Sequence, residues 1–337
     1  MVPVFNLGST GFAFPRSLPC GGVCFLSEQF LITHYYHSGF SVANGDTLLV
    51  FDYWRGEEGE LTGARELTPE DLSVFTQVFV FVSHEHVDHL DPVIYTWKDH
   101  PAISYIVSSD MPVGTRGKRM APGDTLDLAP GIRAAAFDST DLGVSFLVDF
   151  RGLKLFHAGD LNFWHWREES TMKEIEEAEQ EFRRAVKPIS RETVDIAFFP
   201  LDPRQGTMFE AGANFFILQV KPRILIPMHY FHRAEVAVEY ARTASSRSTQ
   251  VIAMPRFREE LTVELDDEGY LNVHAAAERE EDELITMESP ADEPEPAPAP
   301  EADSPEFVLE EDDPFAESDL PLSQLSDEDS EADKPLP

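Results

Sequence analysis

The stretch SHEHVDHL occupies residues 83–90 and directly follows the continuously apolar run VFVFV at 78–82. Three histidines, a glutamate and an aspartate crowd into positions 84–89, and titratable groups contribute little to packing at the end of a buried strand. Imidazole and carboxylate together suit Zn²⁺, Mn²⁺ or Fe²⁺, whereas Ca²⁺ takes oxygen ligands only. The pattern H-x-H-x-D-H therefore predicts a metal site in the loop after this strand.

The spacing within the motif divides its side chains between two ion positions. His84 and His86 stand two apart in an extended segment and can converge on one ion from the same side. Asp88 and His89 follow and can reach a second position close by, while Glu85 alternates away and is expected to be solvated. The alternative is a chance histidine-rich turn on the surface, which this spacing argues against.

Composition divides the chain into three zones. Residues 1–27 are rich in Gly and Pro and form a leader outside the fold, and residues 28–277 have the pattern of a packed α/β domain. Residues 278–337 are acidic and Pro-rich, with too few apolar side chains to pack, so this tail is predicted to be disordered.

The central zone contains more strands than helices. Thr171 and Glu174 suit a capping box, an apolar stripe follows at helical spacing, and Pro188 marks the stop. Further helices are expected at 209–220 and 234–243. Strand-like runs are FLITHYY, TLLVFDY, VFVFV, ISYIV, IRAAAF, VSFLVDF, LKLFHA, VDIAFF, RILIPM, QVIAM and LTVEL. Because strands follow one another in pairs, two sheets packed face to face with helices outside suit the pattern.

Charge and targeting signals narrow the partners. The chain carries 26 basic and 62 acidic side chains, a net charge of −36. Such a balance argues against nucleic acid, which is bound through clustered Lys and Arg, but not against a small anionic substrate held by a few local cations. No run approaches the ~20 apolar residues of a membrane span, and the N-terminus lacks a signal-peptide pattern. The expectation is a cytoplasmic protein without a membrane partner.

The motif and its companions resemble the metallo-β-lactamase-fold hydrolase superfamily. Asp52 ends the run TLLVFD, Asp160 ends FHAGD, and His229 lies in IPMHY, in the order of that superfamily's landmarks. HSGF at 37–40 and HAGD at 157–160 make the chain similar to the branch that contains ascorbate-phosphate lactonase and hydrolases of unassigned substrate. DLNFWHW at 160–166 and PLDPRQG at 200–206 resemble the unassigned group.

This resemblance implies an αββα four-layer sandwich with a metal centre at one edge between the sheets. One ion would take His84 and His86, and the other Asp88, His89 and His229. Asp160 would bridge the two ions, and Asp52 would support the site from behind. The cofactors implied are two divalent transition-metal ions, zinc or manganese, with iron as a further option.

The chain departs from the superfamily pattern at one ligand. Relatives supply a third histidine to the first ion from the loop before the strand VSFLVDF, where this chain has AFDSTDLGV at 136–144. Asp138 and Asp141 are the candidates to replace it, with Ser139 a weaker one. Asp141 as ligand would tilt the site from zinc toward manganese or iron. Alternatively Asp141 serves a turn or cap, and the first site is weak or empty, leaving one metal.

Other side chains near the motif's companions are candidates for supporting roles, and most of them have a structural alternative. His37 either hydrogen-bonds at the site or is a satisfied structural histidine. His157 is expected to orient a ligand from behind, and Trp164 to form a pocket wall or cap the core. Arg204 either receives an anionic substrate group or pairs with Asp202 at the surface.

The sequence thus predicts a metal-dependent hydrolase. Two adjacent ions would lower the pKa of a bridging water to give a hydroxide nucleophile, with Asp88, His89 and Asp160 as the catalytic residues. The expected substrate is a small ester, lactone or phosphorylated metabolite. Two alternatives stay open: a phosphodiesterase or nuclease of the same fold, and a non-catalytic, metal-stabilised binding module with an acidic interaction tail.

Overall fold

The structure is a computed structural model that describes residues 27–57, 61, 63, 66–166, 169–246 and 248–275. Contacts divide the chain into two compact units, Met1–Glu288 and Ser289–Pro337, and all described residues belong to the first unit. Apart from Ser27, the predicted leader at 1–27 and the predicted tail at 278–337 lie outside the described residues. Both therefore stay predictions.

The first sheet has eight strands in the order β15-β14-β1-β2-β3-β4-β5-β6. From β15 to β3 the neighbours are antiparallel, and from β3 to β6 they are parallel. The strands are β1 Glu28–His34, β2 Phe40–Asn44, β3 Thr47–Phe51, β4 Gln77–Val82, β5 Ile103–Ser108, β6 Lys118–Met120, β14 Glu259–Leu265 and β15 Leu271–Ala275.

The second sheet has seven strands in the order β13-β12-β11-β10-β9-β8-β7. Strands β10 to β13 run parallel, and β7 to β10 are antiparallel. The strands are β7 Thr125–Ala129, β8 Ile132–Phe137, β9 Ser145–Phe150, β10 Leu153–His157, β11 Ile196–Pro200, β12 Ile224–Met228 and β13 Gln250–Val251.

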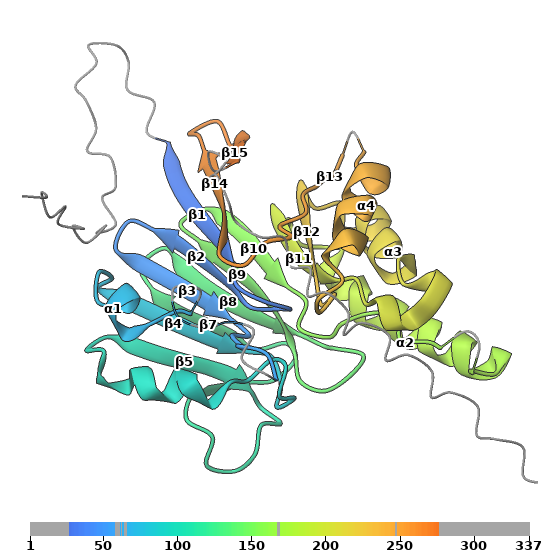
Figure 1. Cartoon of the computed structure of the whole chain (residues 1–337), viewed down its shortest axis with the longest axis horizontal. Helices are drawn as coiled ribbons and strands as arrows, with labels where there is room; N and C mark the ends of the chain where they lie inside the picture. The colour runs from blue at the N-terminus through green and yellow to red at the C-terminus, as the bar shows by residue number, and fades with distance from the viewer. Residues whose placement is uncertain are drawn as a thin grey trace, which may run out of the picture. The chain divides into compact units, whose positions relative to one another are not determined.

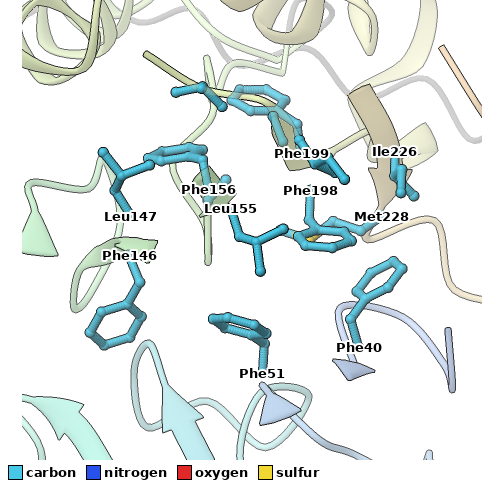
Figure 2. Close-up of a cluster of buried hydrophobic side chains, with 14 of the residues drawn as sticks. Phe40, Phe51, Phe146, Leu147, Leu155, Phe156, Phe198, Phe199, Ile226 and Met228 are labelled. Carbon is cyan, nitrogen blue, oxygen red and sulfur yellow. The ribbon is translucent and has the colours of Figure 1, made fainter. Parts of the chain in front are cut away.

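Aromatic side chains fill the space between the two sheets. Phe40 and Phe51 reach from the first sheet toward the second, where Phe198 meets Phe40 with ring centroids 4.4 Å apart (Figure 2). The next residue, Phe199, points out of the opposite face, as pleating requires, and its ring lies 4.5 Å from that of Phe216 on a covering helix. Strand β11 is therefore buried on both faces, which explains its continuously apolar sequence.

Helices cover the outer faces of the sheets. Figure 1 shows α2 (Met172–Ile189), α3 (Ala211–Val220) and α4 (Ala234–Ala244) gathered beside β11 to β13. On the first sheet, α1 (Pro69–Leu72) and the 3₁₀ helix η2 (Pro92–Asp99) belong to a buried cluster with side chains of β3 and β4. A second 3₁₀ helix, η3, spans Pro203–Met208. The predicted sandwich of two mixed sheets between helices is confirmed.

The helix predictions are confirmed to within a turn. Thr171 caps α2, its side chain accepts from the backbone N–H of Glu174, and the Glu174 side chain accepts from the backbone N–H of Thr171. The helix continues one residue past Pro188 to Ile189, because a proline near the end of a helix interrupts few hydrogen bonds. Phe209 precedes α3 and caps η3 instead.

The sequence patterns did not predict four of the strands, β2, β6, β7 and β15. Strand β2 is buried throughout and joins β3 through a two-residue turn that contains Gly45 at φ 58°. Strand β6 has only three residues, and strand β7, TLDLA, has polar residues between its apolar ones, so neither shows a continuous apolar run. Within the part of the chain that the structure describes, no helix combines the length and apolar character that crossing a bilayer requires.

Candidate metal centre

The carboxyl ends of five strands from both sheets gather at one edge of the sandwich. Parallel neighbours end at the same side of a sheet, so the residues that follow these strands are brought close together. The polar residues are Asp52 after β3, the 83–90 loop after β4, Asp160 after β10, Asp202 after β11 and His229 after β12.

The first group of potential ligands contains His84, His86, Asp141 and Asp160. Nε2 of His84 lies 3.0 Å from Nδ1 of His86 and 3.3 Å from Oδ2 of Asp160. Nδ1 of His86 lies 4.0 Å from Oδ2 of Asp141, and one ion could reach His86, Asp141 and Asp160 together. The side chains of His86 and Asp141 are 43% and 41% exposed, so this group is open to solvent.

The β8–β9 loop presents Asp141 because it packs tightly against the motif. Gly143 adopts φ 77° and donates its N–H to Asp110 at 2.8 Å, and the N–H of Val144 donates to the carbonyl of Ser83 at 3.1 Å. A Cβ atom on Gly143 would lie 2.0 Å from that same carbonyl oxygen, so only glycine fits. Of the candidate replacements for the missing histidine, Asp141 is the one that this loop brings to His86.

The second group contains Asp88, His89 and His229, as the sequence predicts, and also His37. Nε2 of His37 lies 3.3 Å from Oδ2 of Asp88, and Nε2 of His229 lies 3.8 Å from the same oxygen. One ligand atom from each of these four residues lies within 4.8 Å of the others. All but Asp88 are buried.

Asp160 lies between the two groups. Its Oδ1 is 3.0 Å from Nε2 of His89 and 3.4 Å from Nε2 of His229, and its Oδ2 faces His84. The backbone carbonyl of Asp160 accepts a hydrogen bond from Nε1 of Trp164 at 2.8 Å. The position is the one expected of a carboxylate that two ions share.

Buried atoms without hydrogen bonds test whether these residues fit a metal ion. Among the described residues, Nε2 of His89, Nε2 of His229 and Oδ1 of Asp160 find no hydrogen-bond partner, although they converge on one another. A buried polar atom left unsatisfied costs about 1–3 kcal/mol, which a bound cation would offset. The donors are nitrogen and carboxylate oxygen, so the set fits a divalent transition-metal ion.

Asp52 orients His89 from behind, as the sequence predicts. Its Oδ2 lies 2.8 Å from Nδ1 of His89, and its two oxygens accept from the N–H and the hydroxyl of Ser83 at 2.8 and 2.6 Å. With Nδ1–H committed to Asp52, Nε2 of His89 presents its lone pair toward Asp160. The left-handed backbone of Asp52, at φ 40°, turns the chain sharply at the end of β3.

Asp202 lies behind His229, although Nδ1 of His229 makes no hydrogen bond among the described residues, and sequence reasoning missed this placement. Its fully buried carboxylate places Oδ2 3.1 Å from Nδ1 of His229. The same carboxylate accepts from Nε of Arg204 at 3.0 Å and from Nη2 at 2.5 Å. The available signal was an aspartate two residues after the buried strand β11, which is similar to the position of Asp52 directly after β3.

Arg204 and His157 are held by neighbours. The structure favours the pairing of Arg204 with Asp202, and the guanidinium also lies over Phe231, 4.6 Å from the ring centroid. Nε2 of His157 lies 2.9 Å from the carbonyl of Ser38, and Nδ1 of His157 is 3.6 Å from Asp52. His157 therefore ties the loop before β2 to the end of β10.

Trp164 stands at the rim of the second group. Its ring centroid is 5.7 Å from that of His229 and 5.9 Å from that of Trp166, whose residue is 38% exposed. The arrangement fits the pocket wall that the sequence suggests.

Neighbouring charges set the protonation of the site. Burial alone would raise the pKa of the Asp160 carboxyl, but His89 and His229 beside it hold that pKa well below its ordinary value. For Asp88 the same burial is outweighed by the nearby imidazoles of His37 and His89, and its pKa is again lowered. Both carboxylates are therefore ionised near neutral pH, as metal ligands must be.

Comparison with known proteins finds relatives that are named metal-dependent hydrolases. No family model matches the chain. It is 24% identical over 208 residues to a UPF0173 metal-dependent hydrolase of Natranaerobius thermophilus, covering 58% of this chain and 80% of the relative. A UPF0173 metal-dependent hydrolase of Opitutus terrae is 25% identical over 234 residues, which cover 64% of this chain and 90% of that relative.

One solved structure shares the fold, and a second is similar to part of it. Igni18, a novel metallo hydrolase from Ignicoccus hospitalis, superposes with a TM-score of 0.50 at 18% identity, covering 69% of this chain and 98% of that one. The metallo-beta-lactamase fold protein YhfI from Bacillus subtilis covers 74% of this chain and 100% of its own, with a TM-score of 0.46 and 14% identity.

The structure is a sandwich of two mixed sheets with a cluster of histidines and aspartates at one edge. This is the arrangement of the metallo-β-lactamase fold. The chain is similar to the UPF0173 metal-dependent hydrolases and has the fold of the metallo hydrolase Igni18.

Proposed function

We propose that the chain hydrolyses a small ester or lactone at a centre of two divalent ions. The observation that carries the proposal is the convergence of buried, unpartnered donor atoms from both sheets around Asp160, as measured among the described residues. The proposed ligands are His84, His86, Asp141 and Asp160 for the first ion, and Asp88, His89, His229 and Asp160 for the second.

Zinc, manganese and iron suit these donors. The carboxylate of Asp141 in place of a histidine makes the first position richer in oxygen and favours manganese or iron there. Ions bound at both positions would polarise the attacked carbonyl oxygen and lower the pKa of a water molecule between them.

The chain's own residues set the geometry of the reaction. Asp52 holds the ring of His89 through a hydrogen bond, and the carboxylate of Asp202 lies 3.1 Å from Nδ1 of His229, so both imidazoles face Asp160 before substrate arrives. The carboxylate of Asp160 contacts both groups, through His84 on one side and through His89 and His229 on the other. We assign the catalytic roles to Asp88, His89 and Asp160.

The surroundings of the centre favour an uncharged acyl substrate. Trp166 is 38% exposed, Leu142 beside Asp141 is 40% exposed, and Val87 within the motif is 67% exposed. Such an apolar rim stabilises hydrocarbon and ring surface. The guanidinium of Arg204 is already committed to Asp202, which reduces its value as an anion receptor.

A phosphorylated metabolite is the second candidate substrate. The resemblance of HSGF and HAGD to the branch with ascorbate-phosphate lactonase supports it, and Arg204 lies close enough to His229 to contribute a cation after rearrangement. Phosphodiester cleavage of nucleic acid is disfavoured by the net charge of −36, since nucleic acid is bound through clustered cations.

The test is a metal count followed by a substrate panel. The purified protein is analysed for bound metal and assayed with Mn²⁺ and with Zn²⁺ on lactones, carboxylic esters, thioesters, phosphorylated lactones and phosphodiesters. We expect turnover of a lactone or ester that His86→Ala abolishes and Arg204→Gln leaves unchanged. Turnover confined to phosphorylated substrates and lost in Arg204→Gln would replace the first candidate with the second.

The same experiment distinguishes a non-catalytic binding module from a hydrolase. A metal-stabilised binding module would contain a full complement of ions and raise the melting temperature on loading, without turnover in any class of the panel. That outcome would overturn the proposed hydrolysis while leaving the metal centre intact.

A further inference from the structure

His37 lies in the turn between β1 and β2. It belongs to the buried side of the metal centre, the closed side, together with Asp88, His89 and His229. Its side chain is 0% exposed, and its Nε2 lies 3.3 Å from Oδ2 of Asp88. The ring centroid is 4.0 Å from that of His229 and 5.8 Å from that of His89. The imidazole therefore lies among three proposed ligands of the second ion and faces them directly.

The ring nitrogens of His37 are unsatisfied. Within the described part of the chain, neither Nδ1 nor Nε2 of His37 makes a hydrogen bond. The ring packs against Phe231, with centroids 4.1 Å apart, and meets Trp54 edge-on at 5.6 Å, so the surrounding wall is apolar. A buried imidazole without a partner is costly unless something binds it, so packing alone does not explain this histidine.

The backbone holds His37 in a conformation that the fold must enforce. Its φ of 55° lies in the left-handed region, which is unfavourable for a side chain other than glycine. The carbonyl of His37 accepts from the N–H of His229 at 3.2 Å, and the carbonyl of Ser38 is 2.9 Å from Nε2 of His157. Two site residues thus hold the strained turn, and strain of this kind concentrates at functional sites.

Two simpler roles fit less well. A structural histidine is expected to resemble His34, also buried, whose Nδ1 donates to the carbonyl of Met254 at 2.7 Å. A histidine that hydrogen-bonds substrate needs some exposure, and His37 has none. Its position at the end of β1 beside β12 instead completes a set of donors that one ion could reach.

We propose that His37 is a protein ligand of the second ion, together with Asp88, His89 and His229. Three imidazoles, the carboxylate of Asp88 and the shared carboxylate of Asp160 would then hold that ion in a buried site, while the first ion depends on the half-exposed His86 and Asp141. The second position would bind metal first and more tightly. The inference rests on the metal centre of the proposed function, not on its substrate.

The first test compares metal affinity across matched variants. Metal-free protein is titrated with Co²⁺ or Zn²⁺ against a competing chelator, and His37→Gln and His37→Phe are compared with His34→Gln. We expect the tighter of two dissociation constants to rise at least about tenfold in both His37 variants and to stay unchanged in His34→Gln. His86→Ala should raise the weaker constant instead.

A second measurement uses the unaltered chain, so a variant that fails to fold cannot obscure the answer. One equivalent of Co²⁺ shifts the exchangeable ring N–H resonances of its histidine ligands far outside the normal proton spectrum. If His37 binds the ion, we expect three such signals, one each from His37, His89 and His229. In the double variant Asp52→Asn/Asp202→Asn, the signals of His89 and His229 should be lost and that of His37 should remain. Two signals in the unaltered chain, or folded His37 variants with unchanged affinity, would overturn the inference.

The two proposals can fail separately. If His37 variants lose the tighter ion but the unaltered chain turns over no substrate in the panel, the hydrolysis proposal fails and the ligand assignment stands. If turnover occurs and His37 variants retain both ions at unchanged affinity, the reverse holds.

Discussion

The two sides of the metal centre differ in how they shield an ion from water. On the closed side, His37, His89 and His229 are at most 1% exposed, and only Asp88 reaches solvent, at 20%. On the open side, His86 and Asp141 are 43% and 41% exposed. Interactions with an ion are screened far less in a buried site, so we expect an ion to bind more tightly on the closed side than on the open side.

The difference arises from how each side is held. The closed side draws its residues from turns at the ends of β1, β4 and β12, and the carboxylates of Asp52 and Asp202 lie behind two of its rings. The open side depends on the β8–β9 loop, which contributes the carboxylate of Asp141. Four predictions sharpen or break this contrast.

Asp160→Asn should have the largest effect because Asp160 touches both sides. The amide keeps the shape but loses the charge, so both ions should bind more weakly and turnover should fall by about 10²–10³-fold or more. Metal analysis after dialysis and steady-state kinetics measure this. Retention of both ions at unaltered affinity would contradict the assignment of Asp160 as the shared ligand.

Asp202→Asn should weaken the closed side alone. Loss of the carboxylate behind His229 should reduce affinity for the tighter ion by about 10- to 100-fold and leave the weaker ion unchanged. Arg204→Gln is the matched control, since it removes a partner of Asp202 but not the contact with His229. Equal weakening of both ions would mean that the two sides are not independent.

Asp141→Ala should affect the open side alone and lower bound metal by about one equivalent. Asp141→His should restore that equivalent and shift the preference of this position from manganese toward zinc. Elemental analysis of protein loaded with mixed Mn²⁺ and Zn²⁺ gives both results. Unchanged stoichiometry in Asp141→Ala would favour a turn or capping role for this aspartate.

His34 should make the region behind the closed side sensitive to acid. Burial lowers the pKa of His34 to about 4, whereas an unfolded histidine titrates near 6.5. Between these values the unfolded chain binds a proton that the folded chain excludes, so stability falls as the pH falls, by up to about 3 kcal/mol. Urea unfolding of metal-free protein at pH 7.5 and 5 measures the loss, and His34→Gln should reduce it. Equal losses in both proteins would contradict this origin.

Much of the fold could be predicted from local patterns. The capping box at Thr171 and the doubly buried run of β11 each reflect neighbours in the chain, so sequence spacing reveals them. Strand β2 was not predicted because Ser41 and Asn44 interrupt its apolar residues, and β7 was not predicted because polar residues separate its apolar ones, so pairing with a neighbouring strand decides both.

The motif SHEHVDHL by itself predicts a metal site at the end of β4, since residues two to five apart in one loop must lie together. The identity of the supporting residues was decided only by the tertiary structure. His37 meets His229, and Asp202 turns its carboxylate from the surface to the same ring, because β11 and β12 of one sheet end beside the first turn of the other. Contacts of this kind depend on how two sheets pack, and that packing leaves no periodic trace along the chain.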